Sequence, residues 1–233
     1  TRAASCKVAD QMLVFGGATY GKKYLASLYS LNGFTEQWRL IEPSGGSVPL
    51  ARTGHTVVCR GEELVLFGGI TETGTALNDL WKFSMLKNVW EKIDYFGDPS
   101  NYGAIPSPRS RHAAASNDTH MFIFGGRAGV TLHTDMWIFD YETYQFQMLN
   151  IDLPFTQNID CRMQHIDHML VLSGCIDQGD YPMPVVFTFD LRTPNVTWVS
   201  HYSTLYSGTT MHSLTPASSN VLLVYGGRRF TDL

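Results

Sequence analysis

Short apolar runs recur along the chain, and four of them are followed by a pair of glycines. Each run has four residues, which suits a short buried strand and is too short for a helix. The runs are Met12–Phe15, Leu64–Phe67, Met121–Phe124 and Leu222–Tyr225, with a weaker copy at Leu170–Ser173. The first glycines of three pairs, Gly16, Gly68 and Gly125, are 52 and 57 residues apart. A period of roughly 50 residues predicts a repeat architecture.

Further signals keep phase with the glycine pairs. Trp38 and Trp90 each lie 22 residues after the first glycine of their pair. Another strand-like run stands between the glycines and the tryptophan, as in Leu28–Leu31 and Leu80–Phe83. An Arg-x-x-His sequence precedes two of the pairs, and its members are Arg52, His55, Arg109 and His112. Each unit therefore predicts four short strands joined by turns, with no competing helical period.

The combined pattern resembles the kelch repeat. Its Asp-aromatic element is matched by Asp79-Leu80-Trp81 and Asp135-Met136-Trp137, whereas the fourth unit lacks one glycine and the Arg-x-x-His sequence. The resemblance covers essentially the whole chain and implies a β-propeller, in which each repeat forms one four-stranded antiparallel blade. The expected fold class is therefore all-β, a kelch-type β-propeller whose blades have strands a to d.

Elementary physics accounts for the recurring residues. The paired glycines end strand b, where the chain must leave the sheet through backbone angles that a Cβ would oppose. The aromatic residues of strands c and d supply apolar area between neighbouring blades. Because one blade cannot bury both of its faces alone, only stacked copies are stable.

The repeat frame predicts that residues 1–233 form part of a single propeller domain. It contains about four and a half blades, whereas the resembling family usually has six. The predicted blade units are 1–42, 52–94, 109–150, 159–201 and an incomplete 209–233. An open arc would expose sheet edges and blade faces, so we expect the sequence to be a piece of a longer domain.

Composition narrows the class of protein. Hydrophobic residues make up 44% of the chain and charged residues 16%, which argues against disorder and against a coiled coil. The net charge of −4 lacks the basic excess of nucleic-acid binders, so no nucleic-acid partner is expected. No apolar run approaches the roughly 18 residues of a membrane span, so no membrane partner is expected.

The cysteines bear on the compartment. They are Cys6, Cys59, Cys161 and Cys175. Four scattered cysteines without a CxxC motif favour reduced thiols in a cytoplasmic protein, with a nuclear location as an alternative. Two glycosylation sequons, at Asn117 and Asn195, keep an extracellular module in consideration.

Two motifs resemble a phosphate-binding loop and a metal site, but each is better explained as part of the repeat structure. Gly16–Lys23 matches the phosphate loop G-x-x-x-x-G-K, but Lys23 stands where Ser or Thr would hold magnesium, and no helix pattern follows. A second group has metal-ligand side chains at Cys161, His165, His168 and Cys175. A strand rises about 3.3 Å per residue, which would carry Cys175 far from His168. We therefore expect no metal and no cofactor.

No sequence feature indicates catalysis. His55 and His112 occupy equivalent repeat positions, which favours packing or hydrogen bonding over general base chemistry. The chain has no G-x-S-x-G or H-E-x-x-H motif. These residues are therefore expected not to form an enzyme, although a catalytic domain elsewhere in a longer chain stays open.

Loop lengths distinguish the two faces of the predicted propeller. The turns a–b and c–d are short, at Arg60–Glu62, Leu86–Asn88, Asn117–Thr119 and Glu142–Tyr144. The loops b–c and d–a are long, at Ala18–Leu25, Glu42–Ala51, Ile70–Leu77, Tyr95–Pro108 and Ile176–Pro184. Because recognition usually resides in long loops on a rigid scaffold, the long-loop face is the candidate partner-binding face.

Basic and aromatic residues, which are favoured in protein interfaces, gather in these loops. The candidate partner-binding residues are Tyr20, Lys22, Lys23, Tyr24, Tyr95, Phe96, Tyr102, Arg127 and Tyr181. Since arginine pairs well with carboxylates and phosphates, the expected partner is a protein or peptide with an acidic or phosphorylated segment.

The favoured function is a protein–protein interaction module within a larger protein, either a scaffold or a substrate-recruiting propeller. One alternative is the regulatory propeller domain of a multidomain enzyme, such as a fusion of kelch repeats with a phosphatase. Another is an extracellular interaction module. The fold-level resemblance does not choose among them.

Overall fold

The computed structural model describes residues 2–97, 99, 102–149, 160–173, 185–192, 199–202, 213–218 and 221–225. These residues form strands joined by turns and contain no α-helix. Consequently, none of the described segments is a helix that could cross a membrane.

Blades 1 and 2 are four-stranded antiparallel sheets with the strands in chain order. Blade 1 comprises β1 (Ala4–Val8), β2 (Gln11–Phe15), β3 (Leu28–Asn32) and β4 (Trp38–Ile41). Blade 2 comprises β5 (Thr56–Arg60), β6 (Glu63–Ile70), β7 (Ala76–Ser84) and β8 (Val89–Ile93). Each strand pairs with its neighbour along the chain, which is the meander expected for strands a to d.

Blades 3 and 4 have the same order. Blade 3 comprises β9 (Ala113–Ser116), β10 (His120–Phe124), β13 (Met136–Asp140) and β14 (Gln145–Leu149), with a ribbon of β11 (Arg127–Ala128) and β12 (Thr131–Leu132). Blade 4 comprises β15 (Arg162–Ile166), β16 (Met169–Ser173), β17 (Val185–Asp190) and β18 (Val199–Tyr202). A two-stranded sheet follows, of β19 (Ser213–Ser218) and β20 (Val221–Tyr225).

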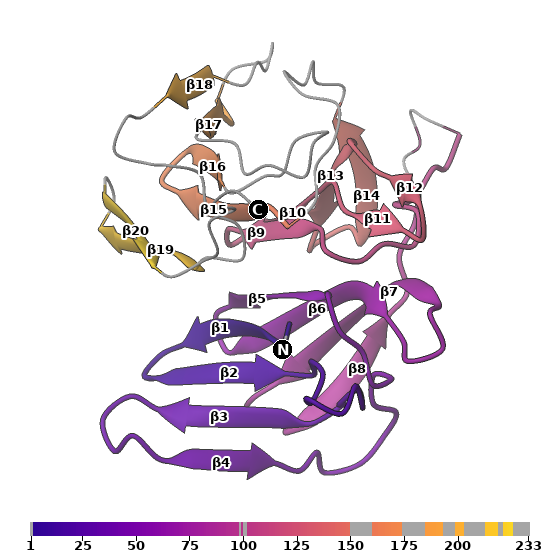
Figure 1. The fold of residues 1–233 in the computed structure, drawn as a ribbon, viewed down its shortest axis with the longest axis vertical. Helices are drawn as coiled ribbons and strands as arrows, with labels where there is room; N and C mark the ends of the chain where they lie inside the picture. Colours follow the sequence, from indigo (N-terminus) through magenta and orange to yellow (C-terminus); the bar gives the residue numbers. More distant parts are fainter. Residues whose placement is uncertain are drawn as a thin grey trace, which may run out of the picture.

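The a strands of successive blades contact one another, namely β1 with β5, β5 with β9, β9 with β15 and β15 with β19. Figure 1 shows the sheets following one another around this common centre. The predicted all-β propeller with four-stranded antiparallel blades is therefore confirmed. The strands lie within the predicted blade units, except that β18 extends one residue beyond 201. The limits of the domain and the total of six blades stay predictions.

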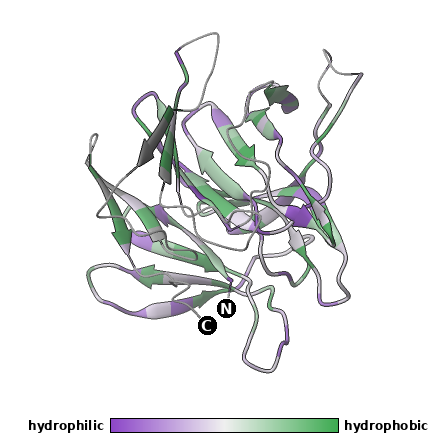
Figure 2. Ribbon diagram, turned by 45° about the horizontal axis from the view of Figure 1, so that its top comes forward, coloured by the Kyte–Doolittle hydropathy of each residue, from purple (hydrophilic) through white to green (hydrophobic). Residues whose placement is uncertain are grey.

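The hydrophobic core lies between blades, because alternate residues of each strand point to opposite faces of its sheet. Between blades 1 and 2 it includes Leu13, Phe15, Leu64, Leu66 and Trp90. Equivalent clusters lie between blades 2 and 3 and between blades 3 and 4. Figure 2 shows hydrophobic residues concentrated in the strands, whereas many connecting loops are hydrophilic.

The tryptophan of strand d has different surroundings in the first two blades. Trp90 is only 4% exposed, and its ring lies 5.1 Å from that of Phe15 in blade 1. Its counterpart Trp38 is 57% exposed. The expectation that strand c and d aromatics pack between blades therefore holds for Trp90, whereas Trp38 lies on the outer face of the first described blade. Among the described residues, no blade covers the face of blade 1 that carries Trp38 and Tyr29.

The second glycine pair shows why the repeat requires glycine. A Cβ on Gly68 would lie 2.8 Å from the Arg109 carbonyl oxygen of the next blade. A Cβ on Gly69 would lie 2.8 Å from the His55 Cβ of its own blade. Both residues also have positive φ, at 63° and 100°, which side chains disfavour. The absence of a Cβ on the first glycine thus lets the next blade approach closely. Its absence on the second lets strand a of the same blade approach closely.

Candidate functional site

A buried arginine holds together three parts of blade 2. Arg52 is 0% exposed, and its two Nη atoms donate to the carboxylate of Asp79 at 2.6 and 2.8 Å. Nη1 also donates to the Gly68 carbonyl at 3.0 Å, and Nε donates to that of Leu50 at 2.9 Å. Trp81 Nε1 donates to Asp79 Oδ2 at 2.7 Å. The guanidinium therefore clamps the d–a loop to the end of strand b and the start of strand c.

Blade 3 repeats this arrangement with Arg109. Its Nη atoms donate to Asp135 at 2.6 and 2.8 Å, and Trp137 Nε1 donates to the same carboxylate at 2.6 Å. Burial raises the pKa of Asp135, but the hydrogen bonds and charge of Arg109 outweigh burial and leave that pKa below its ordinary value. Because Arg52 and Arg109 are buried and paired, they stabilise blades and are not available to a partner.

The repeat histidines join neighbouring blades. His55 Nε2 lies 3.1 Å from the Phe15 carbonyl oxygen of blade 1, and because a carbonyl only accepts, Nε2 is the protonated nitrogen. His112 Nε2 lies 2.7 Å from Thr56 Oγ1 of blade 2. Each ring also packs edge-on against a phenylalanine of the preceding blade. Both histidines therefore have the packing and hydrogen-bonding role that their repetition indicated.

Buried neutral histidines make stability depend on pH. Burial, together with the charge of Arg52, lowers the pKa of His55 to about 3, although the bond to Phe15 opposes this effect. The unfolded state binds a proton near the ordinary pKa of 6.5, whereas the native state does not. The contribution of His55 is thus complete above pH 6.5 and is lost as pH falls, by about 1.4 kcal/mol per pH unit.

We expect urea unfolding between roughly pH 7 and pH 5 to show this loss, and His55→Gln to reduce its slope. Burial also lowers the pKa of His112 well below its ordinary value, so this residue adds to the same slope. The carboxylates of Asp79 and Asp135, whose pKa values lie below the ordinary 3.8, contribute only at lower pH. An unchanged slope in the variant would contradict a buried neutral His55.

Four equivalent residues preceding the a strands form an arc around the propeller centre, here called the axial arc. They are Arg2, Gly54, Arg111 and Asp160, and all have positive φ, between 56° and 63°. Each amide donates to the carbonyl of the preceding member, at 3.4, 2.7 and 3.2 Å. Positive φ in residues other than glycine costs of order 1–3 kcal/mol and is concentrated at functional sites. The sequence does not predict this arc, since left-handed backbone at arginine and aspartate has no clear sequence signal.

Charged side chains surround the axial arc. Arg111 pairs with Asp160 through two hydrogen bonds, of which Nε to Oδ1 measures 2.8 Å. Arg162 lies two residues after Asp160, and Arg2 is exposed. Because strand a begins here, the arc lies on the side from which the d–a and b–c loops emerge. Three arginines with one aspartate make this centre of the long-loop face locally basic.

The b–c loops are ordered hairpins. In blade 1 the Thr19 amide donates to the Lys23 carbonyl at 2.9 Å, and in blade 2 that of Thr71 donates to Thr75 at 3.0 Å. In blade 3 the ribbon of β11 and β12 occupies the same place. Three hairpins therefore extend from strands b and c on the long-loop face, and they are termed the b–c hairpins below.

The structure places five of the nine candidate residues on the b–c hairpins. Tyr20, Lys22 and Lys23 are exposed at the tip of the first, and Tyr24 is half-buried beside them. Arg127 begins the third hairpin, where its backbone pairs with Ser110 before strand a. All five lie on the long-loop face, but the first and third hairpins belong to different blades.

The other candidates are placed differently. Tyr95 has a structural role, because its hydroxyl donates to the Asn78 carbonyl at 2.9 Å and its ring packs on Phe146. Phe96 lies beside Gln145, next to the c–d turn of blade 3, and is thus separated from the hairpins. Tyr102 is exposed in the d–a loop. Tyr181 lies outside the described residues.

The suspected phosphate loop belongs to the repeat. A Cβ on Gly16 would lie 2.7 Å from His55 Cε1, so this glycine admits the next blade as Gly68 does. The chain then enters the first b–c hairpin instead of a helix. Backbone amides at a helix N-terminus, which a phosphate loop requires, do not follow in this segment.

The suspected metal ligands have other contacts. Cys161 is disulfide-bonded and only 2% exposed, and the His165 ring stacks on Phe122. His168 Nδ1 lies 2.5 Å from the carboxylate of Asp167. Cys175 lies outside the described residues. Within the described part of the chain, no group of three or more ligand-type residues could hold a metal ion.

A disulfide joins Cys6 in β1 to Cys59 in β5, with Cα atoms 5.6 Å apart. None of the described cysteines is free. The expectation of reduced thiols is therefore wrong for these cysteines. Residues 53 apart become neighbours because the a strands of successive blades lie side by side. The prediction of a cytoplasmic protein loses the support of free thiols and stays a prediction.

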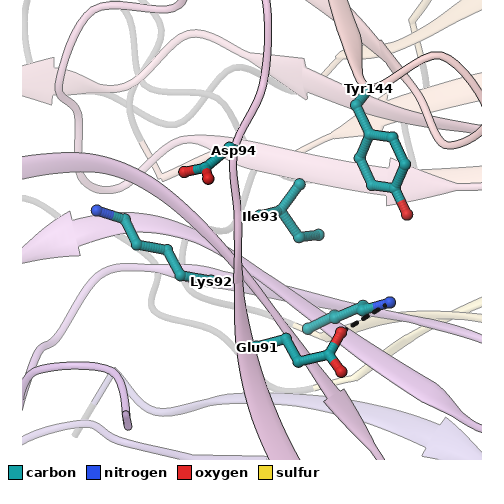
Figure 3. A pocket seen from close by; sticks show the side chains of 6 residues that line it. Glu91, Lys92, Ile93, Asp94 and Tyr144 are labelled. Carbon is teal, nitrogen blue, oxygen red and sulfur yellow. Dashed lines mark ion pairs between the residues drawn. The ribbon is translucent and has the colours of Figure 1, made fainter.

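Figure 3 shows a hollow at the outer strands of blade 2. Its lining residues are Lys82, Glu91, Lys92, Ile93, Asp94 and Tyr144. Lys82 Nζ lies 3.0 Å from Glu91 Oε2, and this ion pair is partly exposed. The hollow therefore mixes both signs of charge and favours no one class of ligand.

Residues 2–227 match the family model described as the KLHDC2/KLHL20/DRC7 Kelch-repeats domain. The chain is 31% identical over 138 residues to acyl-CoA-binding domain-containing protein 5 of Arabidopsis thaliana, covering 59% of this chain and 20% of that protein. It is 31% identical over 141 residues to tRNA wybutosine-synthesizing protein 2/3/4 of Oryza sativa subsp. japonica, covering 60% of this chain and 13% of that protein.

Human kelch domain-containing protein 10 is 29% identical over 150 residues, which cover 63% of this chain and 33% of that protein. The matched segments thus span between 13% and 33% of the lengths of these relatives. The family match extends over nearly the whole chain and agrees with the blades, the glycine pairs and the Arg–Asp–Trp clamps. The chain therefore belongs to the kelch-repeat family.

Proposed function

We propose that this propeller is a protein-interaction module, serving as a scaffold or a substrate-recruiting domain within a larger protein, and that its partner binds the long-loop face. The observation that carries this proposal is the convergence of the b–c hairpins and the strained axial arc on one face. A rigid set of blades holds both in place, which suits recognition by preorganised loops.

The chemistry of this face favours an acidic or phosphorylated segment of a protein or peptide. Lys22 and Lys23 are exposed on the first b–c hairpin, and Arg127 begins the third. Guanidinium groups bind carboxylates and phosphates through paired hydrogen bonds. The net charge of −4 gives no general attraction for anions, so affinity depends on these basic residues of the long-loop face.

Charge reversal tests the proposal. We expect the triple variant Lys22→Glu, Lys23→Glu, Arg127→Glu to weaken binding to an array of acidic and phosphoserine peptides by roughly tenfold, and to reduce its salt dependence. Within the described part of the chain, these three side chains make no hydrogen bond or ion pair that holds the blades, so the melting temperature should change little. Fluorescence anisotropy with the best peptide of the array measures the affinity.

Lys87→Glu is the matched control, since Lys87 is exposed in the c–d turn of blade 2 on the opposite face. Arg60 is unsuitable, because its Nε donates to the Asp118 carbonyl at 2.5 Å and its guanidinium lies 4.8 Å from the Tyr141 ring centroid. Equal weakening by Lys87→Glu, or equal binding of neutral peptides, would argue against the proposed face and partner chemistry.

A second candidate is the regulatory propeller domain of a multidomain enzyme. The matched segment covers only 20% of acyl-CoA-binding domain-containing protein 5 and 13% of tRNA wybutosine-synthesizing protein 2/3/4, so most of each relative lies outside the match. The names of these two relatives also point to functions other than protein binding alone. Both facts favour the second candidate. In both candidates the described residues bind and do not catalyse, since their repeat histidines are buried between blades. A cytoplasmic location, with nuclear and extracellular alternatives, stays a prediction.

A further inference from the structure

The disulfide between Cys6 and Cys59 crosses the junction of blades 1 and 2. Both cysteines point toward the shared interface from neighbouring a strands, and they border the apolar cluster between these blades. Their Cα separation of 5.6 Å lies in the usual range for a disulfide. The pair therefore links two repeat units covalently near the propeller centre.

The repeat itself does not require this link. Cys6 pairs with Leu13, as Val58 pairs with Val65 in blade 2. Cys59 pairs with Leu64, as Ser116 pairs with Met121 in blade 3. At the junction of blades 2 and 3 the two positions are thus held by Val58 and Ser116, which pack there without a crosslink.

Noncovalent contacts also join blade 1 to blade 2. The Gly17 amide donates to the Arg52 carbonyl at 2.9 Å, and the Trp90 ring packs on Phe15. Cleavage of the disulfide would leave these contacts in place, so the two blades would stay docked in the ground state and separate only in locally opened states. The crosslink mainly restricts how far the blades can separate in locally opened states.

The two cysteines of this disulfide are only partly buried. Cys6 and Cys59 are half-buried, whereas Cys161 is 2% exposed. Exchange requires that a thiolate approach one sulfur of the disulfide, so access controls its rate. The residues of the Cys6–Cys59 bond are therefore less covered than Cys161, which favours exchange at this bond.

We propose that Cys6 and Cys59 form a reversible redox site, whose reduction by a thiol allows blade 1 to open locally from blade 2. An attacking thiolate, from glutathione or a dithiol oxidoreductase, forms a mixed disulfide with one cysteine as the Cys6–Cys59 bond breaks. A second thiolate then releases that cysteine. In total the pair gains two electrons and two protons, and two reductant thiols become one disulfide.

The first test measures the redox state. The protein is equilibrated in buffers with different ratios of reduced to oxidised glutathione, its free thiols are alkylated, and Cys6 and Cys59 are quantified by mass spectrometry. As the ratio of reduced to oxidised glutathione rises, we expect the thiol fraction of Cys6 and that of Cys59 to rise together from low to high values. A pair that stays wholly oxidised or wholly reduced in every buffer would overturn the proposal.

The second test measures opening by hydrogen exchange. On reduction we expect amides of β1 to β4 to exchange about tenfold faster or more, with little change in β9, β10, β13 and β14. The variant Cys6→Ser, Cys59→Ser should exchange as the reduced protein does in every buffer. It also separates this effect from reduction of the disulfide at Cys161. Equal exchange in the oxidised protein and this variant would contradict the coupling to blade 1.

A relocated crosslink provides the matched control. Adding Val58→Cys and Ser116→Cys to the serine variant places a cysteine pair at the equivalent positions between blades 2 and 3. We expect reduction of that pair to change exchange at its own junction while blade 1 stays insensitive. If blade 1 again became redox-sensitive, the effect would belong to the whole propeller, and the proposed local role of Cys6–Cys59 would be wrong.

Discussion

Replacing Asp79 with alanine is expected to destabilise the protein by about 3–5 kcal/mol, because it leaves a buried guanidinium without its carboxylate. Arg52 is 0% exposed, so water cannot replace the two lost hydrogen bonds. Trp81 Nε1 loses its acceptor in the same substitution. Urea unfolding followed by tryptophan fluorescence measures the change, and Asp135→Ala should have a similar effect because blade 3 repeats the clamp.

Glu91→Ala is the control for this prediction. Glu91 also pairs with a cation, Lys82, at 3.0 Å, but its side chain is 45% exposed. An exposed ion pair contributes at most about 1 kcal/mol. If Asp79→Ala cost no more than Glu91→Ala, the Arg52–Asp79 clamp would not stabilise blade 2.

A double replacement distinguishes a buried unpaired charge from lost packing. In Arg52→Met with Asp79→Leu, both charges are removed together, so the penalty of an unpaired guanidinium disappears. We expect this variant to recover part of the stability lost in Asp79→Ala. Full recovery is not expected, because the carbonyls of Gly68 and Leu50 would lose their donors.

Removal of the Trp90 side chain is expected to cost about 3–5 kcal/mol, as is typical of a large buried aromatic residue. Its ring lies 5.1 Å from Phe15 of blade 1 and 5.2 Å from Phe83 of its own blade. Trp90→Ala would leave a cavity between two rigid sheets that cannot easily close. Thermal or urea unfolding measures the loss.

Trp38→Ala is the matched control, since Trp38 has the same repeat position but is largely exposed. We expect it to cost less than about 1 kcal/mol, because little apolar area is returned to water. Equal costs for the two variants would mean that Trp38 is covered as fully as Trp90. The sequence alone would have predicted equal effects, since both tryptophans follow their glycine pairs at the same distance.

Much of the candidate face could be anticipated, but not which of its residues are available. The lengths of the b–c loops indicated the long-loop face as the candidate, and the structure places Tyr20, Lys22 and Lys23 on a hairpin of that face. Tyr95 is also an aromatic residue in a long loop, yet its hydroxyl donates to the Asn78 carbonyl and its ring packs on Phe146. Loop length reports where a segment emerges, whereas availability depends on contacts with residues distant in sequence.

The sequence by itself determined the strands, their grouping into blades and the structural nature of the repeat glycines, arginines and histidines. These features recur with a regular spacing, because each blade packs against its neighbours through the same set of contacts. Only the tertiary structure decided that Cys6 meets Cys59, that the axial arc adopts positive φ, and that Trp38 is exposed while Trp90 is buried. Each of these depends on which blade faces which. A periodic pattern shows which face of a strand is apolar. It does not show which neighbouring blade packs against that face.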